Sequence, residues 1–257
     1  MEEIRNKKGF ICDMDGVIYH GDSLLPGAKE FVEWLKAENK EFLFLTNNAS
    51  KTPRELKQKL ERLDIYVDEK HFYTSALATA YFLKTQAPGC SVYVIGDAGL
   101  YNALYNVDIT INDVNPDYVV VGETRSYNYD SLLRAVKLVN NGARLIGTNY
   151  DMTGPSEDGI IPATRALISP IEMATGKHAY FVGKPNPLMM RTGLKLLGCK
   201  SEDTVIIGDR MDTDIISGIE AEIDTVLVLS GVSNENTPYE FAYRPKYILQ
   251  GVGDILG

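Results

Sequence analysis

The segment Phe10–Tyr19 reads FICDMDGVIY. A short apolar run is followed by two aspartates separated by one residue, Asp13 and Asp15, and apolar residues resume at Val17. Two carboxylates at the end of a buried strand repel each other and are costly to remove from water. A turn would explain them, because Asp and Gly are common turn residues. A bound cation would explain them as well, and the rest of the sequence helps to distinguish these two explanations.

The composition is that of a globular protein with a sizeable core. The chain has 257 residues, of which 44% are hydrophobic. This length accommodates one large domain or two smaller ones. The formal net charge is −9. An acidic chain is a poor general binder of nucleic-acid polymers, whose phosphates need a basic surface, but a few local donors still suffice for a small phosphate ligand.

Cysteine usage and the N-terminal residues indicate a cytoplasmic protein. Cys12, Cys90 and Cys199 are odd in number and far apart, which favours reduced thiols and gives no zinc-like spacing. The first ten residues, MEEIRNKKGF, lack the apolar stretch of a secretory signal. No apolar run is long enough to span a bilayer, so we expect no membrane partner.

Apolar strand candidates alternate with helix candidates along the chain. The strand candidates are residues 9–12, 41–46, 92–95, 118–121, 144–147, 180–182, 204–209 and 225–229. Helix starts are indicated after Pro26-Gly27, at Thr52-Pro53 with Glu55 completing a capping box, and at Asn186-Pro187. Continuously apolar strands between helices predict an α/β fold with a doubly wound, mostly parallel sheet that is covered on both faces.

Four of the strand candidates end in polar residues. In chain order these are Asp13 with Asp15, then Thr46-Asn47-Asn48, Lys184 and Asp209. Ligands of parallel sheets bind beyond the carboxyl ends of the strands, so neighbouring strands would bring these groups together. Carboxylates suit Mg²⁺, the lysine would relieve their repulsion, and threonine and asparagine offer neutral donors for phosphoryl oxygens. The set favours a functional site over an isolated turn.

Four motifs in a fixed order connect the chain with a known family. They are DMDGVIY at 13–19, LTNNAS at 45–50, GKPNP at 183–187 and GDRMDTDI at 208–215. With this set the chain resembles phosphatases of the haloacid dehalogenase superfamily, in its NagD-like branch (subclass IIA), over essentially its whole length. The resemblance implies a Rossmann-like core with a smaller α/β cap domain inserted between the second and third motifs. We expect the core at residues 1–86 and 179–257 and the cap at 87–178.

The resemblance also implies a Mg²⁺-dependent phosphatase that hydrolyses a small phosphomonoester, such as a nucleotide or a sugar phosphate, through an aspartyl-phosphate. In such an enzyme Asp13 would be the nucleophile and a metal ligand. Asp15 would act as general acid and base and would contact the metal through its backbone carbonyl. Asp209 would bind the metal directly. Asp214 would contribute through water or by orienting the site, and direct binding of the metal by Asp214 is left open; it could equally be a structural residue at a helix start.

The same resemblance assigns the phosphoryl group to Thr46, Asn47, Asn48 and Lys184. In the expected cap, Asn149 and Asp151 of the segment TNYD at 148–151 are candidate substrate contacts, and turn chemistry explains them about as well. Glu123 and Arg125 after Gly122 are further candidates.

Two alternative functions stay open. One is a phosphotransferase on the same core, and the other is a phosphate-binding or regulatory protein with incidental turnover. The presence of both Asp13 and Asp15 counts against binding alone, which needs no acid–base residue. The expected partner is a small phosphorylated metabolite, and a homodimer is left open.

Overall fold

The computed structural model describes residues 1–156 and 159–257, and its packing divides the chain into two units. The first unit comprises Met1–Thr46, Leu56–Tyr73 and Lys184–Gly257, and the second comprises Asn47–Glu55 and Thr74–Gly183. These ranges state which residues pack together. The limits of the inserted cap domain, expected at residues 87 and 178, stay a prediction.

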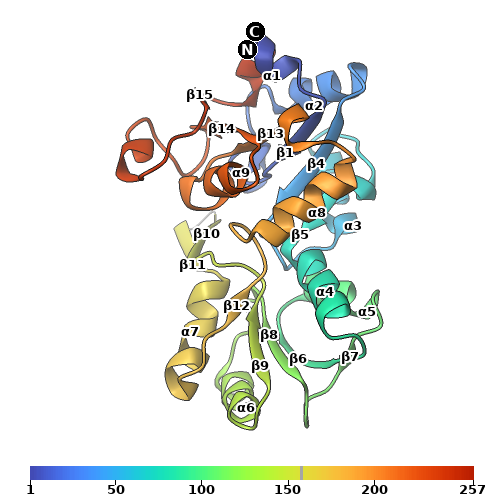
Figure 1. Cartoon of the computed structure of the whole chain (residues 1–257), viewed down its shortest axis with the longest axis vertical. Helices are drawn as coiled ribbons and strands as arrows, with labels where there is room; N and C mark the ends of the chain where they lie inside the picture. Colours follow the sequence, from blue (N-terminus) through green and yellow to red (C-terminus); the bar gives the residue numbers. More distant parts are fainter. Residues whose placement is uncertain (157–158) are drawn as a thin grey trace. The chain divides into compact units, whose positions relative to one another are not determined.

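The first unit is built on a six-stranded sheet (Figure 1). Its strands, in spatial order, are β15 (Tyr247–Leu249), β14 (Asp224–Val228), β13 (Thr204–Gly208), β1 (Gly9–Cys12), β4 (Glu41–Thr46) and β5 (Phe72–Thr74). β1 pairs in parallel with both β13 and β4, and β14 pairs in parallel with β13 and β15. The chain continues from β1 to β4 on one side and returns through β13 on the other. The strand order therefore reverses at β1, where open α/β sheets bind their ligands.

Helices cover both faces of this sheet. They are α1 (Glu2–Arg5), α2 (Ala28–Ala37), α3 (Pro53–Arg62), α8 (Pro187–Leu197) and α9 (Ile216–Glu220). Phe10 and Cys12 of β1 lie in one hydrophobic core with Leu35 of α2. Ile11 points to the other face, where α8 packs so closely that a side chain at Gly193 would touch it. This arrangement follows from the alternation of side chains along a strand.

The second unit has its own five-stranded sheet, in which every neighbouring pair is parallel. In spatial order the strands are β12 (Tyr180–Phe181), β9 (Arg144–Gly147), β8 (Tyr118–Val121), β6 (Ser91–Ile95) and β7 (Thr110–Ile111). Its helices are α4 (Ser75–Gln86), α5 (Ala98–Tyr105), α6 (Tyr129–Asn140) and α7 (Thr164–Thr175). α6 and α7 share a hydrophobic core with this sheet, and α4 packs against α5.

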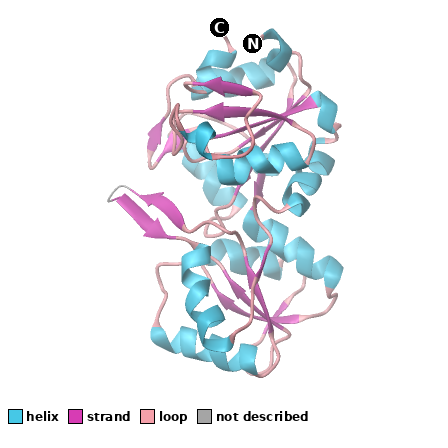
Figure 2. Ribbon diagram, turned by 60° about the vertical axis from the view of Figure 1, so that its left-hand side comes forward, coloured by secondary structure: helices cyan, strands magenta, loops and turns pink. Residues whose placement is uncertain are grey.

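The remaining regular elements are short. Two antiparallel hairpins pair β2 (Tyr19–His20) with β3 (Ser23–Leu24) and β10 (Thr153–Ser156) with β11 (Gly159–Pro162), as Figure 2 shows for the second pair. Single 3₁₀ turns occur at Glu69–His71, Ser201–Asp203, Thr237–Glu240 and Val252–Ile255. A π-helical segment covers Met211–Ile215 and runs directly into α9.

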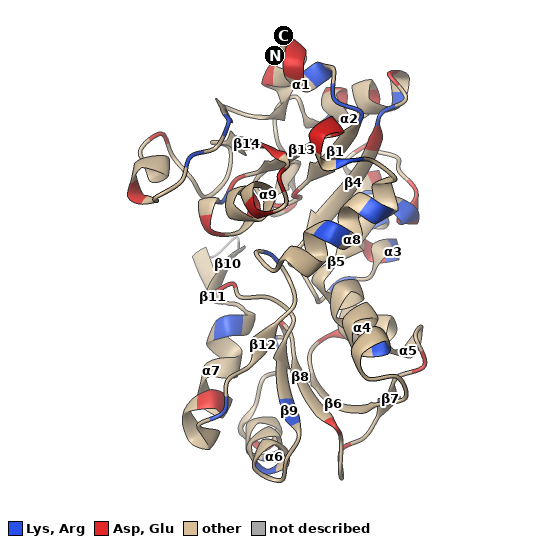
Figure 3. Ribbon diagram, in the orientation of Figure 1, with Lys and Arg blue, Asp and Glu red and all other residues tan. Residues whose placement is uncertain are grey.

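Acidic and basic residues are interspersed over both units (Figure 3). No helix in the part of the chain that the structure describes is long and apolar enough to cross a membrane.

The predicted fold class is confirmed, with a parallel α/β sheet in the first unit and a separate, smaller parallel sheet in the second. Each of the eight expected strands is present, within one residue at either end. The sequence analysis missed β5, β7, β15 and both hairpins, which are all two to four residues long. Segments this short carry little periodicity, although the equally short β1, β8, β9 and β12 were predicted from their apolar runs.

The predicted helix start at Asn186-Pro187 is confirmed in detail. The side-chain oxygen of Asn186 accepts a hydrogen bond from the backbone N–H of Leu188 at 2.9 Å, which satisfies one of the free donors of the first turn of α8. The helix ends at Leu197, and the capping residue Gly198 has a φ of 67°, a conformation that glycine adopts without strain. This cap fixes the helix that directly follows the Gly183-Lys184-Pro185 motif.

We expect Asn186→Ala to lower the free energy of unfolding by about 1 kcal/mol, because the capping hydrogen bond is lost. Urea unfolding followed by circular dichroism measures this difference. Asn186→Ser is the matched control, since serine supplies a capping oxygen of its own. An equal loss in both variants would contradict the assignment of the effect to the cap.

Candidate active site

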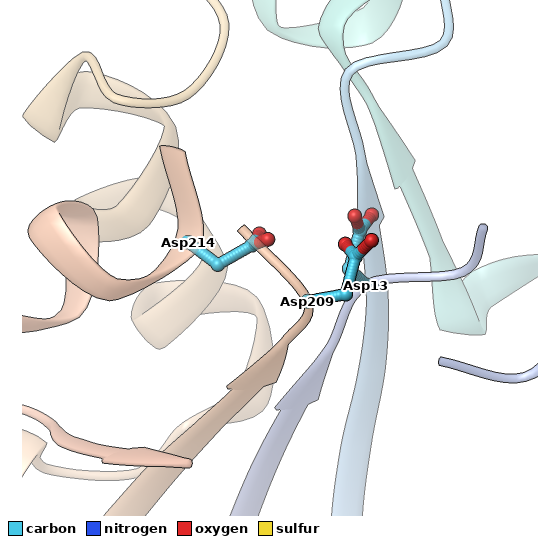
Figure 4. Close-up of side chains that lie close together, drawn as sticks. All are labelled: Asp13, Asp209 and Asp214. Atoms are coloured by element: carbon cyan, nitrogen blue, oxygen red, sulfur yellow. The ribbon is translucent and has the colours of Figure 1, made fainter. Parts of the chain in front are cut away.

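Three carboxylates converge at the carboxyl end of the first sheet. Asp13 follows β1, Asp209 follows the neighbouring strand β13, and Asp214 comes from the π-helical segment. Each offers one oxygen, and these three oxygens lie within 4.8 Å of one another. Figure 4 shows the carboxylates of Asp13 and Asp209 side by side, with Asp214 pointing toward them. The structure therefore joins the first and fourth sequence motifs in one cluster.

Lys184 bridges two of these acids from within the core. Its Nζ lies 2.9 Å from Oδ1 of Asp13 and 2.7 Å from Oδ1 of Asp214, and it donates a further hydrogen bond to the carbonyl of Leu45 at 3.1 Å. Only 2% of the residue is exposed. Burial disfavours the ammonium ion, but the two carboxylates outweigh burial and raise the pKa of Lys184. The buried lysine thus remains charged and holds both acids in place.

Burial raises the pKa of all three clustered aspartates. Asp214 reaches a pKa of about 6, with Lys184 opposing the rise and Asp13 adding to it. The pKa of Asp209 lies well above its ordinary value because of burial and the charges of Asp214 and Asp13. Burial also raises the pKa of Asp13, although its interaction with Lys184 counteracts part of the increase. Two like unit charges about 4 Å apart repel by ~4 kcal/mol at an effective dielectric constant near 20, so the cluster is under electrostatic stress.

A divalent cation would relieve this stress. Three ionised carboxylates and one ammonium ion leave two negative charges to be balanced. The cluster offers only carboxylate oxygens, which are the ligands of hard ions such as Mg²⁺ or Ca²⁺ rather than of zinc. The charge and the ligand chemistry of the cluster both fit a bound divalent metal ion.

Two glycines make room for the carboxylate of Asp209. A Cβ atom on Gly231 would lie 2.1 Å from Oδ2 of Asp209, and one on Gly16 would lie 2.4 Å from the same oxygen. Gly16 also has a φ of 79°, which disfavours any other residue at this turn. The backbone N–H of Val232 donates to this oxygen at 2.7 Å. The position of Asp209 is therefore set by backbone atoms on two sides.

Asp15 stands outside the group of three. Its side chain is 40% exposed, and its Oδ1 lies 3.6 Å from Nδ1 of His20. Burial raises its pKa, while His20 and Lys59 counteract the rise. This carboxyl group can exchange protons with solvent, as an acid–base residue must. The contact of its backbone carbonyl with a metal stays a prediction.

The second motif divides at one peptide bond, because Thr46 packs with the first unit and Asn47 with the second. Thr46 is the buried last residue of β4. The carboxamide of Asn47 donates to Oδ2 of Asp151 at 3.1 Å. The side-chain oxygen of Asn48 accepts hydrogen bonds from the backbone N–H groups of Ser50 and Lys51, both at 3.0 Å, so it closes a turn.

The other candidates of the second unit divide into two kinds. Asn149 is fully buried and donates to the carbonyl of Asn47 at 2.7 Å and to Oε1 of Glu123 at 2.9 Å. Burial raises the pKa of Glu123 to about 7. Arg125, in contrast, is exposed.

Sequence reasoning missed the part played by Gly231 and Val232. These residues belong to the run Ser230-Gly231-Val232, which follows β14. The Ser-Gly pair predicts a turn, but it does not predict which residues lie close to that turn in the folded chain. Only the folded chain shows that this turn lies against Asp209.

Comparisons with known proteins agree with this site. Residues 10–110 match the family of haloacid dehalogenase-like hydrolases, and residues 181–255 match a second family described as HAD-hydrolase-like. The chain is 44% identical to dihydroxyacetone phosphatase of Corynebacterium glutamicum over 246 residues, which cover 96% of this chain and 90% of the relative. It is 43% identical to the ribonucleotide monophosphatase NagD of Escherichia coli over 248 residues, which cover 96% and 98% of the two chains.

Solved structures give the same result. The structure of NagD from Escherichia coli matches with a TM-score of 0.90 and 42% identity, covering 97% of this chain and 98% of NagD. The 4-nitrophenylphosphatase from Thermotoga maritima matches with a TM-score of 0.94 and 32% identity, covering 98% and 97% of the two chains. The four motifs, the acidic cluster and these full-length matches lead to one conclusion: the chain belongs to the haloacid dehalogenase-like hydrolases, in their NagD-like family of phosphatases.

Proposed function

We propose that this protein is a Mg²⁺-dependent phosphatase that hydrolyses small phosphomonoesters through an aspartyl-phosphate intermediate. The observation that carries the proposal is the position of Asp13. It lies at the reversal point of the sheet, it shares an acidic cluster with Asp209 and Asp214, and its carboxylate is 2.9 Å from the ammonium group of Lys184. This arrangement supports a carboxylate that is held as a nucleophile beside a metal ion.

Asp13 attacks the phosphorus atom in this mechanism. The ion pair with Lys184 orients the attacking carboxylate of Asp13. The lysine also offsets part of the negative charge of the incoming phosphoryl group. Asp13, Asp209 and Asp214 would hold Mg²⁺, with the backbone carbonyl of Asp15 as a further ligand. When bound, the ion supplies electrostatic stabilisation of the phosphoryl oxygens.

Asp15 moves the proton in both halves of the reaction. It donates a proton to the leaving alcohol when the aspartyl-phosphate forms, and it then accepts a proton from the water that hydrolyses it. The partial exposure of its carboxyl group and its raised pKa support this role, because the group must carry a proton in one half and release it in the other.

Thr46, Asn47 and Asn48 bind the oxygens of the phosphoryl group in this proposal. A hydroxyl and two carboxamides offer neutral donors, which suit these oxygens without competing for the metal. The burial of Thr46 and Asn47 supports the assignment, since a hydrogen bond is stronger away from bulk water.

The proposed substrate class is a small phosphorylated metabolite. The similar proteins are named for dihydroxyacetone phosphate, ribonucleotide monophosphates, sugar phosphates and 4-nitrophenyl phosphate as phosphatase substrates. The three cysteines are free thiols, which supports the cytoplasm as the compartment.

Replacing Asp13 with Asn should reduce kcat for 4-nitrophenyl phosphate by at least roughly a thousandfold, because a carboxamide cannot form the covalent intermediate. Release of 4-nitrophenolate measures kcat, and circular dichroism reports whether the fold is intact. Asp22→Asn, at a highly exposed carboxylate, is the control and should keep wild-type turnover. Wild-type turnover by Asp13→Asn would refute the mechanism.

Removal of divalent ions with EDTA should abolish turnover, and Mg²⁺ should restore it. Mg²⁺ should also raise the thermal unfolding temperature of the metal-free protein, because it binds only the folded state.

Gly231→Ala should need a Mg²⁺ concentration about tenfold or more higher for the same rise in unfolding temperature. The reason is that the new methyl group displaces the carboxylate of Asp209.

Gly251→Ala is the matched control for the metal experiment. A Cβ atom at Gly251 approaches no neighbour more closely than 4.0 Å, and the residue has an extended φ of −165°. This variant should respond to Mg²⁺ like the wild type. Equal Mg²⁺ responses of Gly231→Ala and the wild type would contradict the placement of the metal site.

A phosphate-release screen over nucleotides, sugar phosphates and triose phosphates should identify a preferred substrate that depends on Mg²⁺. Transfer of the phosphoryl group to an added alcohol, in preference to water, would favour a phosphotransferase. Tight binding of a phosphorylated compound without release of phosphate would favour a regulatory protein. Either of these results would overturn hydrolysis as the principal activity.

A further inference from the structure

The second sheet also gathers polar groups at the carboxyl ends of its strands. Glu123 follows β8 by two residues, and Asn149 follows the neighbouring strand β9 by two residues. Their side chains are joined by a hydrogen bond of 2.9 Å between Nδ2 of Asn149 and Oε1 of Glu123. Neither residue belongs to the acidic cluster of the first unit.

This pair holds the segment Asn47–Ala49 of the second motif. The other oxygen of Glu123 accepts a hydrogen bond from the backbone N–H of Ala49 at 3.2 Å. Asn149 donates to the carbonyl of Asn47 at 2.7 Å, and Ser75 donates to the same carbonyl at 2.5 Å. Asn47 and Ala49 are therefore fixed through both a backbone carbonyl and a backbone N–H.

The side chain of Asn47 is confined as well. Its Nδ2 donates to Oδ2 of Asp151 at 3.1 Å. Its Oδ1 is so close to Gly183 that a Cβ atom on that glycine would lie 2.6 Å from it. The carboxamide therefore lies between the carboxylate of Asp151 and the backbone at Gly183.

We propose that Glu123 is a positioning residue of the phosphatase reaction, which holds Asn47–Ala49 in the conformation that presents Asn47 to the phosphoryl group. The proposal rests on the function proposed above. Glu123 suits this task because an ionised carboxylate accepts two hydrogen bonds at once, one from Ala49 and one from Asn149. It acts through Asn47.

The ionisation of Glu123 links this role to pH. Burial raises its pKa to about 7, the hydrogen bonds from Asn149 and Ala49 counteract the rise, and the nearby carboxylates of Asp151 and Asp97 add to it. Protonation turns one acceptor oxygen into a donor that faces an N–H group, so one of the two hydrogen bonds is lost. The segment Asn47–Ala49 should therefore be held less firmly below about pH 7 than above it.

Glu123→Gln tests the proposal, because glutamine keeps the size of the side chain and has one acceptor oxygen in place of two. We expect kcat/KM for 4-nitrophenyl phosphate to fall about tenfold above neutral pH, the effect of one charge-assisted hydrogen bond. The wild type should lose kcat/KM as the pH falls through about 7, and the variant should lack this step. The proposal would be overturned if Glu123→Gln had the kcat/KM of the wild type, or if its kcat/KM still fell as the pH dropped through about 7.

Glu172→Gln is the matched control. Glu172 lies in α7 of the same unit and also accepts hydrogen bonds from a backbone N–H, that of Ala179 at 2.8 Å, and from a side chain, that of Arg165 at 2.6 Å. It has no hydrogen bond to Asn47–Ala49 among those that the structure describes. Glu172→Gln should keep both kcat/KM and the pH step. Equal losses in the two glutamine variants would indicate general destabilisation and would overturn the proposal.

Binding of inorganic phosphate separates this proposal from the proposed function. Titration calorimetry in the presence of Mg²⁺ should show about tenfold weaker binding of phosphate to Glu123→Gln than to the wild type. A wild type that binds phosphate but releases none from any ester would refute the phosphatase function and leave the positioning role supported by the titration. If the wild type is an active phosphatase and Glu123→Gln binds phosphate with the same affinity, the positioning role alone is refuted.

A second variant guards against misfolding of Glu123→Gln. Asp151→Ala removes the acceptor of the Asn47 carboxamide and leaves both hydrogen bonds of Glu123 in place. It should raise KM for 4-nitrophenyl phosphate by about threefold to tenfold, because Asn47 is then oriented less firmly. A wild-type KM in this variant would also count against the proposal.

Discussion

The buried ammonium ion of Lys184 is the interaction on which the acidic end of the first sheet depends. Two carboxylates and a backbone carbonyl surround its Nζ at hydrogen-bonding distance, and almost none of the residue reaches solvent. Loss of one partner of such a buried pair costs about 3–5 kcal/mol, because an uncompensated charge remains in the interior. This cation lies between Asp13 and Asp214 and counteracts the rise that burial causes in both pKa values, so it favours the ionised forms of two neighbouring carboxyl groups. The remaining negative charge then creates the demand for a divalent ion.

The sequence was sufficient to locate Asp13 and Asp209, but not to show that β12, the strand before Lys184, belongs to the other sheet. Asp13 and Asp209 follow apolar runs whose pattern identifies buried parallel strands, so their location at one edge of a sheet could be predicted. That β1 lies between β13 and β4 is a property of the topology, which periodicity does not encode. The nearness of Gly231 to Asp209 depends on a loop 22 residues further along the chain, and no local pattern reports it. The capping box of Thr52 and Glu55 was recognisable, whereas the packing of residues 47–55 with the second unit was not.

The two sheets place acidic residues at their strand ends in different environments. In the first sheet, Asp13 and Asp209 are gathered with a third carboxylate, and their mutual repulsion favours a cation. In the second sheet, the carboxylate of Glu123 is occupied by two N–H donors, and its charge stabilises a segment of backbone. The same topological position therefore holds carboxylates in different surroundings in the two units. The difference comes from the neighbours, which are acids in the first case and hydrogen-bond donors in the second.

The close approach of Gly231 to Asp209 bears on how activity is inferred from motifs. The four motifs contain the charged residues of the site, but Gly231 lies outside all of them. Under the proposed function, a homologous chain could keep each acidic residue and the lysine and still lose its metal site through one added methyl group at this position. Such a chain would contain all four motifs and would still be expected to be inactive. The absence of a side chain at this position is thus as informative about catalytic competence as the presence of the aspartates.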